Sequence, residues 1–437
     1  MRHWLAVVLT VVGMPAAVAA ELPGPPMGWN SWDSYGTSVT EAQVKANAEY
    51  MARHLAVHGW QYIVVDIQWS EPNPRAGGYN PDAHLQMDAF GRLTPAVNRF
   101  PSAADGKGFQ PLAEYVHSLG LKFGIHIMRG IPRQAVGANT PVEATQVHAA
   151  DIANQYSLCP WNHDMYGVDV SRPGGQAYYD SIVRMYARWG VDFIKADDIL
   201  RPIHRDEIAA LHSAIQKSGR PMVLSLSPGP ARAEDLDFLR QNANLWRVSD
   251  DFWDEWRLLA ENFTLMGIWG GAGRAGAWPD GDMLPLGRIG IMAERGTDRR
   301  TRFTPLEQRT VMSLWSIAQS PLIFGGDLQS NDAATNALIT NDEVLAVDQQ
   351  GAHGREVLSS GPRRIWTADA PDGAKYVGVF NLGERALDVR IEWPELALPE
   401  NCAVRDLWER KDLGAMRSGT FRVEPHASGL YKVTRVK

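Results

Sequence analysis

Residues 191–198 read VDFIKADD, a mostly apolar run that ends in two acidic residues. Short apolar runs of this kind are typical of strands buried in a parallel sheet. A stretch with helical spacing, Gln176 to Trp189, comes directly before it. The segment therefore predicts a strand that follows a helix and presents Asp197 and Asp198 at its carboxyl end.

The same alternation of helix and strand recurs along the first 350 residues. Further strands are expected at 62–66 (YIVVD), 121–128 (LKFGIHIM), 222–227 (MVLSLS), 245–251 (LWRVSDD) and 322–327 (LIFGGD), and near 27–32 and Met283. Further helices are expected at 44–58, 112–119, 206–217, 233–240 and 306–319. Alternating units of this kind form parallel sheets, and eight of them close into a barrel. We therefore predict an α/β fold, a (β/α)₈ TIM barrel with catalytic function over residues 21–350.

The pattern changes from about residue 355. Short strand-like segments are separated by turn residues such as Pro371-Asp372-Gly373. The segments are 364–368, 375–381, 386–393, 403–406, 419–423 and 429–433. This spacing predicts a C-terminal antiparallel β-sandwich over residues 355–437.

The first twenty residues have the pattern of a secretory signal peptide. Arg2 and His3 precede an apolar run, Leu5 to Met14, that is too short to span a bilayer. Small residues at 17–20 offer a cleavage site after Ala19 or Ala20. We expect an exported protein, periplasmic or extracellular, with no integral membrane segment after signal cleavage.

Composition narrows the function class. The formal net charge of −7 gives no basic surface for nucleic acid. Sixteen tryptophans outnumber the twelve tyrosines and twelve phenylalanines. Either a large core holds these indoles, or some of them, such as Trp29, Trp32 and Trp69, stack on sugar rings. The sequence does not fix the oligomeric state.

Metal and disulfide signals are weak. The only cysteines, Cys159 and Cys402, are far apart in the sequence and form no Cys-x-x-Cys motif. His54 and His58 have the spacing of two residues on one helix face, but Leu55 occupies the place of the acidic residue in a His-Glu-x-x-His motif. We interpret them as surface histidines and predict no metal site.

Carboxylates at the predicted strand ends suggest the chemistry. Reacting groups of a TIM barrel lie at the carboxyl ends of its strands. Asp66, the pair 197–198 and the pair 250–251 follow three different strands. Glycoside hydrolysis needs two carboxyl groups facing each other across one bond, and helix capping or metal binding are the alternative uses of such residues. Lys195 lies on the same strand face as Asp197 and would favour its ionised form.

Six ordered motifs resemble glycoside hydrolase family 27, the α-galactosidase and α-N-acetylgalactosaminidase family. They are 26–32 (PMGWNSW), 190–197 (GVDFIKAD), 246–251 (WRVSDD), 280–284 (DGDML), 313–327 (SLWSIAQSPLIFGGD) and 405–408 (RDLW). The resemblance extends from about residue 25 to the end of the chain. It implies a retaining exo-glycosidase that releases terminal α-linked galactose from oligo- or polysaccharides without a cofactor.

The resemblance also implies roles for individual residues. Asp197 matches the nucleophile and Asp251 the acid/base, which selects one member of each Asp-Asp pair. The positions that match sugar-binding residues are Trp32, Asp66, His126, Lys195, Ser227, Arg247 and Asp282.

Several positions depart from the family pattern. The family has a second Asp after Asp66, which holds O6 of galactose, and here Ile67 takes its place. Ser227 stands where α-galactosidases have a Glu, as in the α-N-acetylgalactosaminidases, and His126 replaces a Tyr. Ile199 occupies the place of a cysteine, so the family's disulfide to a Cys near Cys159 is expected to be absent.

These departures leave the sugar open. Beside α-galactose, the same mechanism on α-N-acetylgalactosamine, on β-L-arabinopyranose (a galactose without C6) or on a glucan end is an alternative. A carbohydrate-binding protein without catalytic activity is the alternative from a different class.

Overall fold

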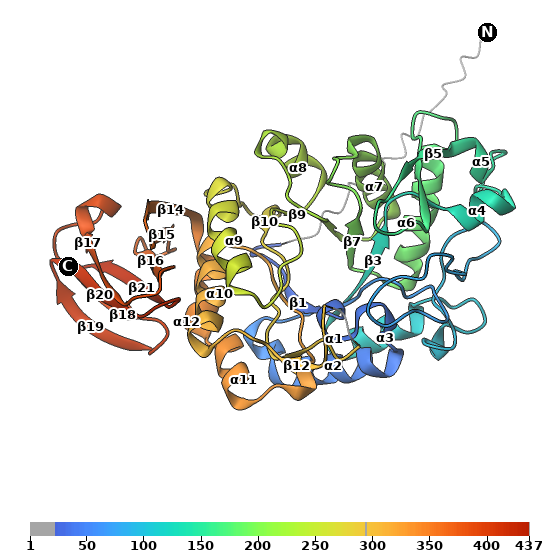
Figure 1. Ribbon diagram of the computed structural model, residues 1–437. Helices are drawn as coiled ribbons and strands as arrows, with labels where there is room; N and C mark the ends of the chain where they lie inside the picture. Colours follow the sequence, from blue (N-terminus) through green and yellow to red (C-terminus); the bar gives the residue numbers. More distant parts are fainter. Residues whose placement is uncertain (1–21, 293–294, 437) are drawn as a thin grey trace, which may run out of the picture.

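The computed structural model describes residues 22–292 and 295–436, and eight parallel strands form the centre of its first part (Figure 1). They are β1 (Met27–Asn30), β2 (Tyr62–Val65), β3 (Lys122–Met128), β7 (Phe193–Asp197), β8 (Val223–Leu226), β9 (Leu245–Arg247), β10 (Trp278–Asp280) and β13 (Leu322–Phe324). The hydrogen-bonded order is β10-β9-β8-β7-β3-β2-β1-β13. The predicted (β/α)₈ barrel is confirmed.

The barrel closes through a single residue that follows β10. Leu284 donates its N–H to the carbonyl of Ile323 (2.8 Å) and accepts from Gly325 N (2.9 Å) beside β13. The strand expected near Met283 was therefore placed too late, because β10 is Trp278–Asp280. Asp282 adopts a positive φ of 86°, which ends the strand before Met283.

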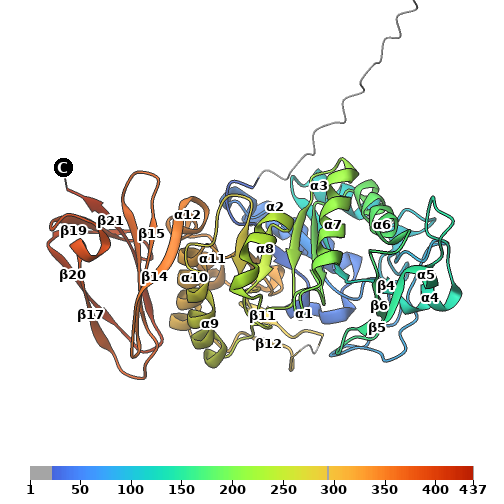
Figure 2. The same ribbon diagram turned by 90° about the horizontal axis from the view of Figure 1, so that it is seen from above.

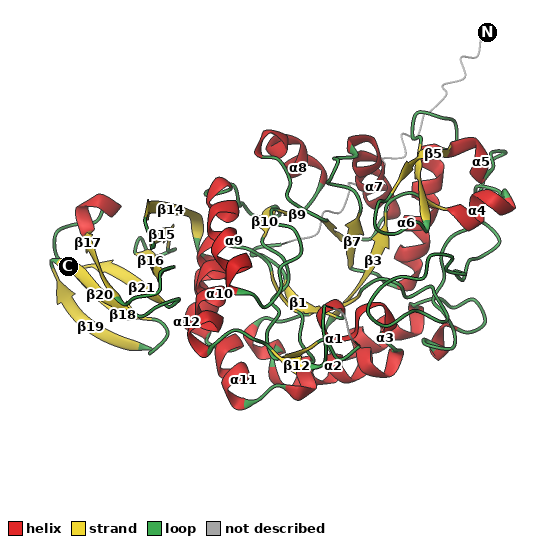
Figure 3. Cartoon of the chain, in the orientation of Figure 1, coloured by secondary structure: helices red, strands yellow, loops and turns green. Residues whose placement is uncertain are grey.

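Helices surround the barrel (Figure 3). They include α2 (Glu41–His54), α3 (Gln110–Ser118), α6 (Gly175–Trp189), α7 (Arg205–Ser218), α8 (Leu236–Asn242), α9 (Trp256–Ile268) and α10 (Pro305–Ala318). Helix α10 begins with a capping box, in which Thr304 Oγ1 accepts from Glu307 N and Glu307 Oε2 accepts from Thr304 N. Helix α6 ends at Gly190, whose φ of 83° suits a glycine C-cap. Within the described residues, no helix is long and apolar enough to cross a membrane.

Side-chain alternation along β7 explains how the barrel positions polar groups. Phe193 packs in a small inner core with residues of β2, β8, β9 and β10. Lys195 and Asp197 follow on the same face at two-residue intervals, nearer the carboxyl end of the strand. The strand thus contributes Phe193 to the apolar cluster near its amino end. Its two charged side chains lie near the carboxyl end, where the reacting groups of such barrels are found.

Long loops at the carboxyl ends of β2 and β3 enlarge one side of the barrel. The loop after β3 contains helices α4 (Arg133–Ala138) and α5 (Ala149–Ile152) and the sheet β4-β6-β5. Its strands are β4 (Ile131–Pro132), β6 (Met165–Val168) and β5 (Ala153–Leu158). This small sheet lies at the end of the molecule opposite the C-terminal strands (Figure 2) and was not predicted from the sequence.

The C-terminal part is an antiparallel β-sandwich, as expected. One sheet has the order β14-β15-β16-β21-β18-β19 and the other pairs β17 with β20. The strands are β14 (Ala352–Ser360), β15 (Arg363–Asp369), β16 (Lys375–Asn381), β17 (Leu387–Glu392), β18 (Cys402–Asp406), β19 (Lys411–Met416), β20 (Ser418–Val423) and β21 (Ser428–Arg435). Strands β14 and β19 were not anticipated, and both lie at the edges of the larger sheet with mostly exposed or half-buried residues.

The sandwich packs on the barrel through α10. Buried Val311 and Met312 of this helix belong to the same apolar cluster as Trp366, Phe380 and Leu430 of the sandwich. Helices α11 (Ala333–Ile339) and α12 (Asp342–Gln350) lead from the barrel into β14. One side of the sandwich therefore joins the core of the barrel, while residues such as Val377, Val379 and Trp393 form a second apolar cluster within the sandwich.

Candidate active site

A cavity of about 280 Å³ opens at the carboxyl ends of the barrel strands. Six of the nine predicted catalytic and sugar-binding residues line it, namely Trp32, Asp66, Lys195, Asp197, Arg247 and Asp251. Its volume is close to the lower end of the range typical of small-molecule sites, about 300–1,000 Å³. The barrel thus brings residues that lie on β7 and β9, or just after β1, β2 and β9, to one small polar space.

Asp197 ends β7 and faces this cavity. Its Oδ2 lies 3.1 Å from Nε2 of His126 on β3, and its Oδ1 accepts a hydrogen bond from the N–H of Asp198 (2.9 Å). Burial alone would raise the pKa of Asp197, but the hydrogen bond and charge of His126 and the charge of Lys195 outweigh it and lower the pKa. The carboxylate is therefore ionised and held by two donors.

Lys195 and Asp66 form a buried ion pair beside Asp197. Lys195 Nζ lies 2.8 Å from Asp66 Oδ2, which also accepts from Asn30 Nδ2 (2.7 Å). Although burial opposes ionisation of Asp66, the charge of Lys195 holds its pKa below the ordinary value. A charged donor and a charged acceptor thus stand side by side, which suits the recognition of vicinal sugar hydroxyls.

Asp251 lies in the loop after β9 and is the more accessible carboxylate. Its side chain is 41% exposed, against 14% for Asp197. Arg247 Nη2 lies 3.4 Å from Asp251 Oδ1, and Arg295 Nη2 lies 3.7 Å from Oδ2. An accessible carboxyl group at the mouth of the cavity can exchange protons with a leaving group and with water.

Arg247 is fixed from its other side by Asp282. Its Nη1 lies 2.7 Å from Asp282 Oδ1, while Asp282 Oδ2 accepts from the N–H of Phe252 (2.8 Å). Burial raises the pKa of Asp282, and the charge of Arg247 opposes that shift. Asp282 is not among the residues that line the cavity, so in this structure it supports Arg247.

The partner residues of the two Asp-Asp pairs have other contacts. Asp198 is buried and binds the guanidinium of Arg129 (2.7 Å). Asp250 is exposed and pairs with Arg201 (2.8 Å), although it also lines the outer cavity. Asp197 is therefore the member of its pair that faces the cavity, whereas both Asp250 and Asp251 reach its rim.

One wall of the cavity is apolar and aromatic. Ile67 and Met283 line it together with Trp32, Tyr79 and Trp161. The rings of Trp32 and Tyr79 are stacked, with centroids 6.2 Å apart and planes at 15°. This wall offers flat apolar faces to a sugar ring.

Trp29 and Trp69, which the sequence offered as sugar-stacking residues, belong to the core. Both side chains are buried, and their indole N–H groups donate to the carbonyls of Gly326 and His126. Of the three tryptophans considered, only Trp32 lines the cavity.

Ser227 lies just behind the cavity wall. Its neighbour Pro228 lines the cavity, whereas Ser227 is buried and its Oγ has no hydrogen-bond partner within the described structure. A sugar contact of Ser227 therefore stays a prediction.

Four residues that line the cavity were not predicted from the sequence as site residues. Tyr79, Arg201 and Arg295 come from loops without a recognisable motif, and Trp161 belongs to the loop between β5 and β6. Of the four, only Trp161 was marked by the sequence, because it lies in the segment 159–169 (CPWNHDMYGVD), which is unusually rich in aromatic and polar residues.

No cysteine is among the described residues that line this cavity. Cys159 and Cys402 are free and buried, and burial raises the pKa of the Cys159 thiol to about 12. No cluster of three or more His, Cys, Asp or Glu side chains suited to a metal occurs in residues 22–292 and 295–436.

Comparison with known proteins decides the family. A model described as alpha galactosidase A matches residues 162–350, and one described as the alpha galactosidase C-terminal beta sandwich domain matches residues 360–433. The crystal structure of a family 27 β-L-arabinopyranosidase from Geobacillus stearothermophilus is 53% identical, with a TM-score of 0.93 over 95% of this chain and 97% of that chain. The chain belongs to glycoside hydrolase family 27.

Other members of family 27 differ in the sugar that their names give. A putative α-N-acetylgalactosaminidase from Bacillus halodurans is 46% identical, with a TM-score of 0.87 over 97% of this chain and all of that one. Alpha-galactosidase 2 of Arabidopsis thaliana is 27% identical over 94% of this chain and 90% of its own length. The chain is thus a glycoside hydrolase of the α-galactosidase type.

Proposed function

We propose that this glycoside hydrolase releases a terminal β-L-arabinopyranosyl residue by a retaining double displacement. The single observation that carries the choice of sugar is Ile67 in the cavity wall beside Asp66. By the resemblance to family 27, position 67 usually carries an Asp whose carboxylate binds O6 of galactose. An apolar side chain there suits a pyranose that has no C6 hydroxymethyl group.

The binding free energy expected for the two sugars also favours arabinopyranose over galactose. A galactoside would bring its O6 hydroxyl against Ile67, which cannot accept a hydrogen bond. Loss of a charged acceptor costs about 1.5–3 kcal/mol toward that hydroxyl. The relative that is 52–53% identical in its two crystal structures carries the name β-L-arabinopyranosidase, which supports the proposal.

The proposed reaction has two steps. Asp197 attacks the anomeric carbon while Asp251 donates a proton to the departing glycosidic oxygen, so a covalent glycosyl-enzyme forms as the glycosidic bond breaks. Asp251 then removes a proton from water, which attacks the same carbon and releases Asp197. Support comes from the ionised, doubly hydrogen-bonded Asp197 and the accessible Asp251.

The sugar assignment is tested with p-nitrophenyl β-L-arabinopyranoside and p-nitrophenyl α-D-galactopyranoside. We expect kcat/KM to favour the arabinoside by about 10–200-fold, the range for one extra group in an apolar pocket. The variant Ile67→Asp should shift the ratio toward the galactoside by at least about tenfold, because it restores an acceptor. Ile67→Val is the matched control and should leave the preference in place.

A second candidate is terminal α-galactose. It is favoured by the curated relatives named alpha-galactosidase, which are 26–28% identical and cover most of this chain. A higher kcat/KM on the galactoside than on the arabinoside would establish this candidate in place of the first. Absence of hydrolysis of every glycoside would instead indicate a carbohydrate-binding protein.

The stereochemical course has its own test. Proton NMR of the earliest product should show the sugar in the anomeric configuration of the substrate, and Asp197→Asn should abolish turnover. An inverted first product would refute the double displacement, whatever the sugar.

Export is proposed on the sequence pattern of residues 1–20, which lie outside the described structure. N-terminal sequencing of the mature protein should find a start at residue 20 or 21 in a periplasmic or extracellular fraction.

A further inference from the structure

Arg129 is a buried cation directly behind the candidate nucleophile. It follows β3, and its side chain is 2% exposed. Its Nε donates to the carbonyl oxygen of Asp198 and its Nη2 to Asp198 Oδ2, both at 2.7 Å. A guanidinium can hold two acceptors of one residue in this way, because its donors form a rigid planar fork.

The other side of the guanidinium is fixed as well. Nη1 donates to Glu207 Oε1 on α7 (2.9 Å) and to Ser157 Oγ on β5 (3.0 Å). Glu207 is held in turn by the hydroxyl of Tyr179 on α6 and by the N–H of Val168 on β6. Arg129 is therefore anchored to elements that do not themselves form the cavity.

These bonds act on the peptide that orients Asp197. Asp198 has a φ of 56°, a conformation that few residues other than glycine adopt. Its N–H donates to Asp197 Oδ1, while the N–H of Arg129 donates to the carbonyl of Asp197 (3.0 Å). The direction of the Asp197 carboxylate thus depends on a backbone conformation that Arg129 holds from two sides.

We propose that Arg129 is a positioning residue for the nucleophile: it locks the end of β7 so that Asp197 points at the anomeric carbon. The proposal rests on the proposed function of Asp197. In the described structure Arg129 is not part of the cavity lining, so it acts only through Asp197 and Asp198. A displacement of about 1 Å at a reacting group can reduce the rate about 100-fold.

Arg220 offers a matched control at the opposite end of the same strand. Its Nε donates to Val191 O (2.8 Å) and its Nη2 to Gly190 O (3.1 Å), and it pairs with Asp192. Like Arg129 it ties neighbouring elements to β7. The amino ends of barrel strands, however, serve stability and not chemistry.

The test compares Arg129→Lys with Arg220→Lys in the full chain on a p-nitrophenyl glycoside that the wild-type enzyme hydrolyses. Lysine keeps the charge but cannot replace the fork, so Arg129→Lys should lower kcat at least about tenfold with KM within about twofold. Arg220→Lys should leave kcat within about twofold, although both variants lower the thermal midpoint. A kcat within twofold of wild type for Arg129→Lys, or equal losses of kcat in both variants, would overturn the proposal.

Two further variants keep the outcome decisive. If Arg129→Lys does not fold, Glu207→Gln takes its place, because it weakens the contact that fixes Arg129. Its kcat should fall at least about threefold, and an unchanged kcat overturns the proposal. Asp197→Asn in the same assay separates the two ideas. If the Asp197→Asn variant keeps its activity, Asp197 is not the nucleophile. If that variant is inactive but the Arg129 and Glu207 variants keep the wild-type kcat, only the positioning role of Arg129 is refuted.

Discussion

At the scale of single residues, the site depends on how neighbours set the charge of one carboxyl group. Asp197 is buried, and burial by itself disfavours its ionised form. His126 and Lys195 reverse that effect, so the nucleophile keeps its charge at a pH where an ordinary Asp, with a pKa of about 3.9, is protonated. By the resemblance to family 27 this position usually holds a Tyr, and in this chain His126 makes the contact with Asp197.

His126→Gln should therefore move the acid limb of the kcat/KM profile to higher pH. A nucleophile must be ionised to attack, and a lowered pKa keeps it ionised at lower pH. Without the charge of His126 the pKa of Asp197 rises, and activity is lost at a higher pH as the medium is acidified.

The control for this variant is His117→Gln. His117 Nε2 pairs with Asp192 Oδ2 at 2.7 Å, a similar contact near the amino end of β7. Its acid limb should coincide with that of the wild-type enzyme. An unmoved acid limb in His126→Gln would show that His126 does not set the charge of Asp197.

At the scale of elements, the barrel strands were largely predictable and the loops were not. Short apolar runs and polar strand ends located β7, β2 and β3, because both features are local properties of the sequence. The end of β10 was misplaced because a positive φ at Asp282 leaves no mark in the hydrophobic pattern. Local pattern thus predicts elements but not their irregular ends.

The same contrast applies to the candidate site. Asp197, Asp251 and Lys195 were found because strand ends and family motifs mark them. Tyr79 and Arg295 reach the cavity from long loops, whose paths depend on contacts distant in sequence. No local feature of the sequence could place them.

The loop between β5 and β6 should contribute to binding. Trp161 lines the cavity and is half-buried, so Trp161→Ala should raise KM by about tenfold through the loss of a stacking face, with little change in thermal midpoint. Tyr156, which is fully exposed on β5 of the same small sheet, is the control. Tyr156→Ala should change neither quantity, and an unchanged KM in Trp161→Ala would exclude this loop from the substrate site.

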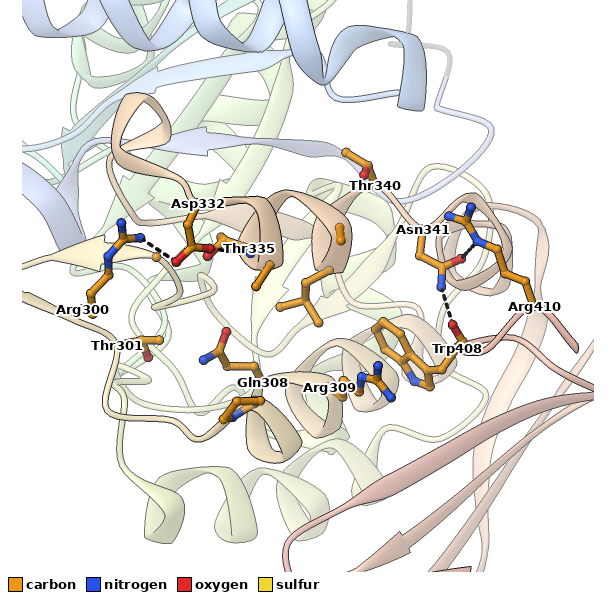
Figure 4. Close-up of a pocket in the computed structure, with 15 residues that line it drawn as sticks. Arg300, Thr301, Gln308, Arg309, Asp332, Thr335, Thr340, Asn341, Trp408 and Arg410 are labelled. Carbon is orange, nitrogen blue, oxygen red and sulfur yellow. Dashed lines mark hydrogen bonds and ion pairs between the residues drawn. The ribbon is translucent and has the colours of Figure 1, made fainter.

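At the scale of the whole molecule, α10 joins the barrel and the sandwich both by its core face and by polar contacts. Trp408 Nε1 donates to Ser313 Oγ (2.9 Å). The guanidinium of Arg309 lies over the Trp408 ring, 5.5 Å from its centroid (Figure 4). Beside them a cleft of about 750 Å³ is lined by α10 and α11, with Trp408 and Arg410 at one end and Arg300 at the other (Figure 4). The contact between barrel and sandwich therefore combines buried apolar packing with polar residues that line a cleft at its edge.

Removal of the sandwich should consequently prevent the barrel from folding. A chain that ends at Gln350 would expose the face of α10 that carries Ile317, whose Cδ1 lies against Gly378 of β16, and Thr310, which donates to the carbonyl of His426. Burial of an apolar side chain such as that of Ile317 stabilises the protein by about 1.5–3 kcal/mol, and a whole face of α10 loses its cover. We expect the truncated chain to aggregate, as measured by size-exclusion chromatography and circular dichroism.

The substitution Trp408→Phe is the milder counterpart in the full chain. It removes the hydrogen bond to Ser313 but keeps an aromatic ring at this position, so it should lower the free energy of unfolding by only about 1 kcal/mol and leave kcat unchanged. A truncated chain that elutes as a folded, active monomer would contradict the shared core and would mean that the sandwich serves something other than the stability of the barrel. A loss of kcat in Trp408→Phe would instead couple the joint to the catalytic cavity, which lies at the carboxyl ends of the barrel strands and has no lining residue in common with the cleft.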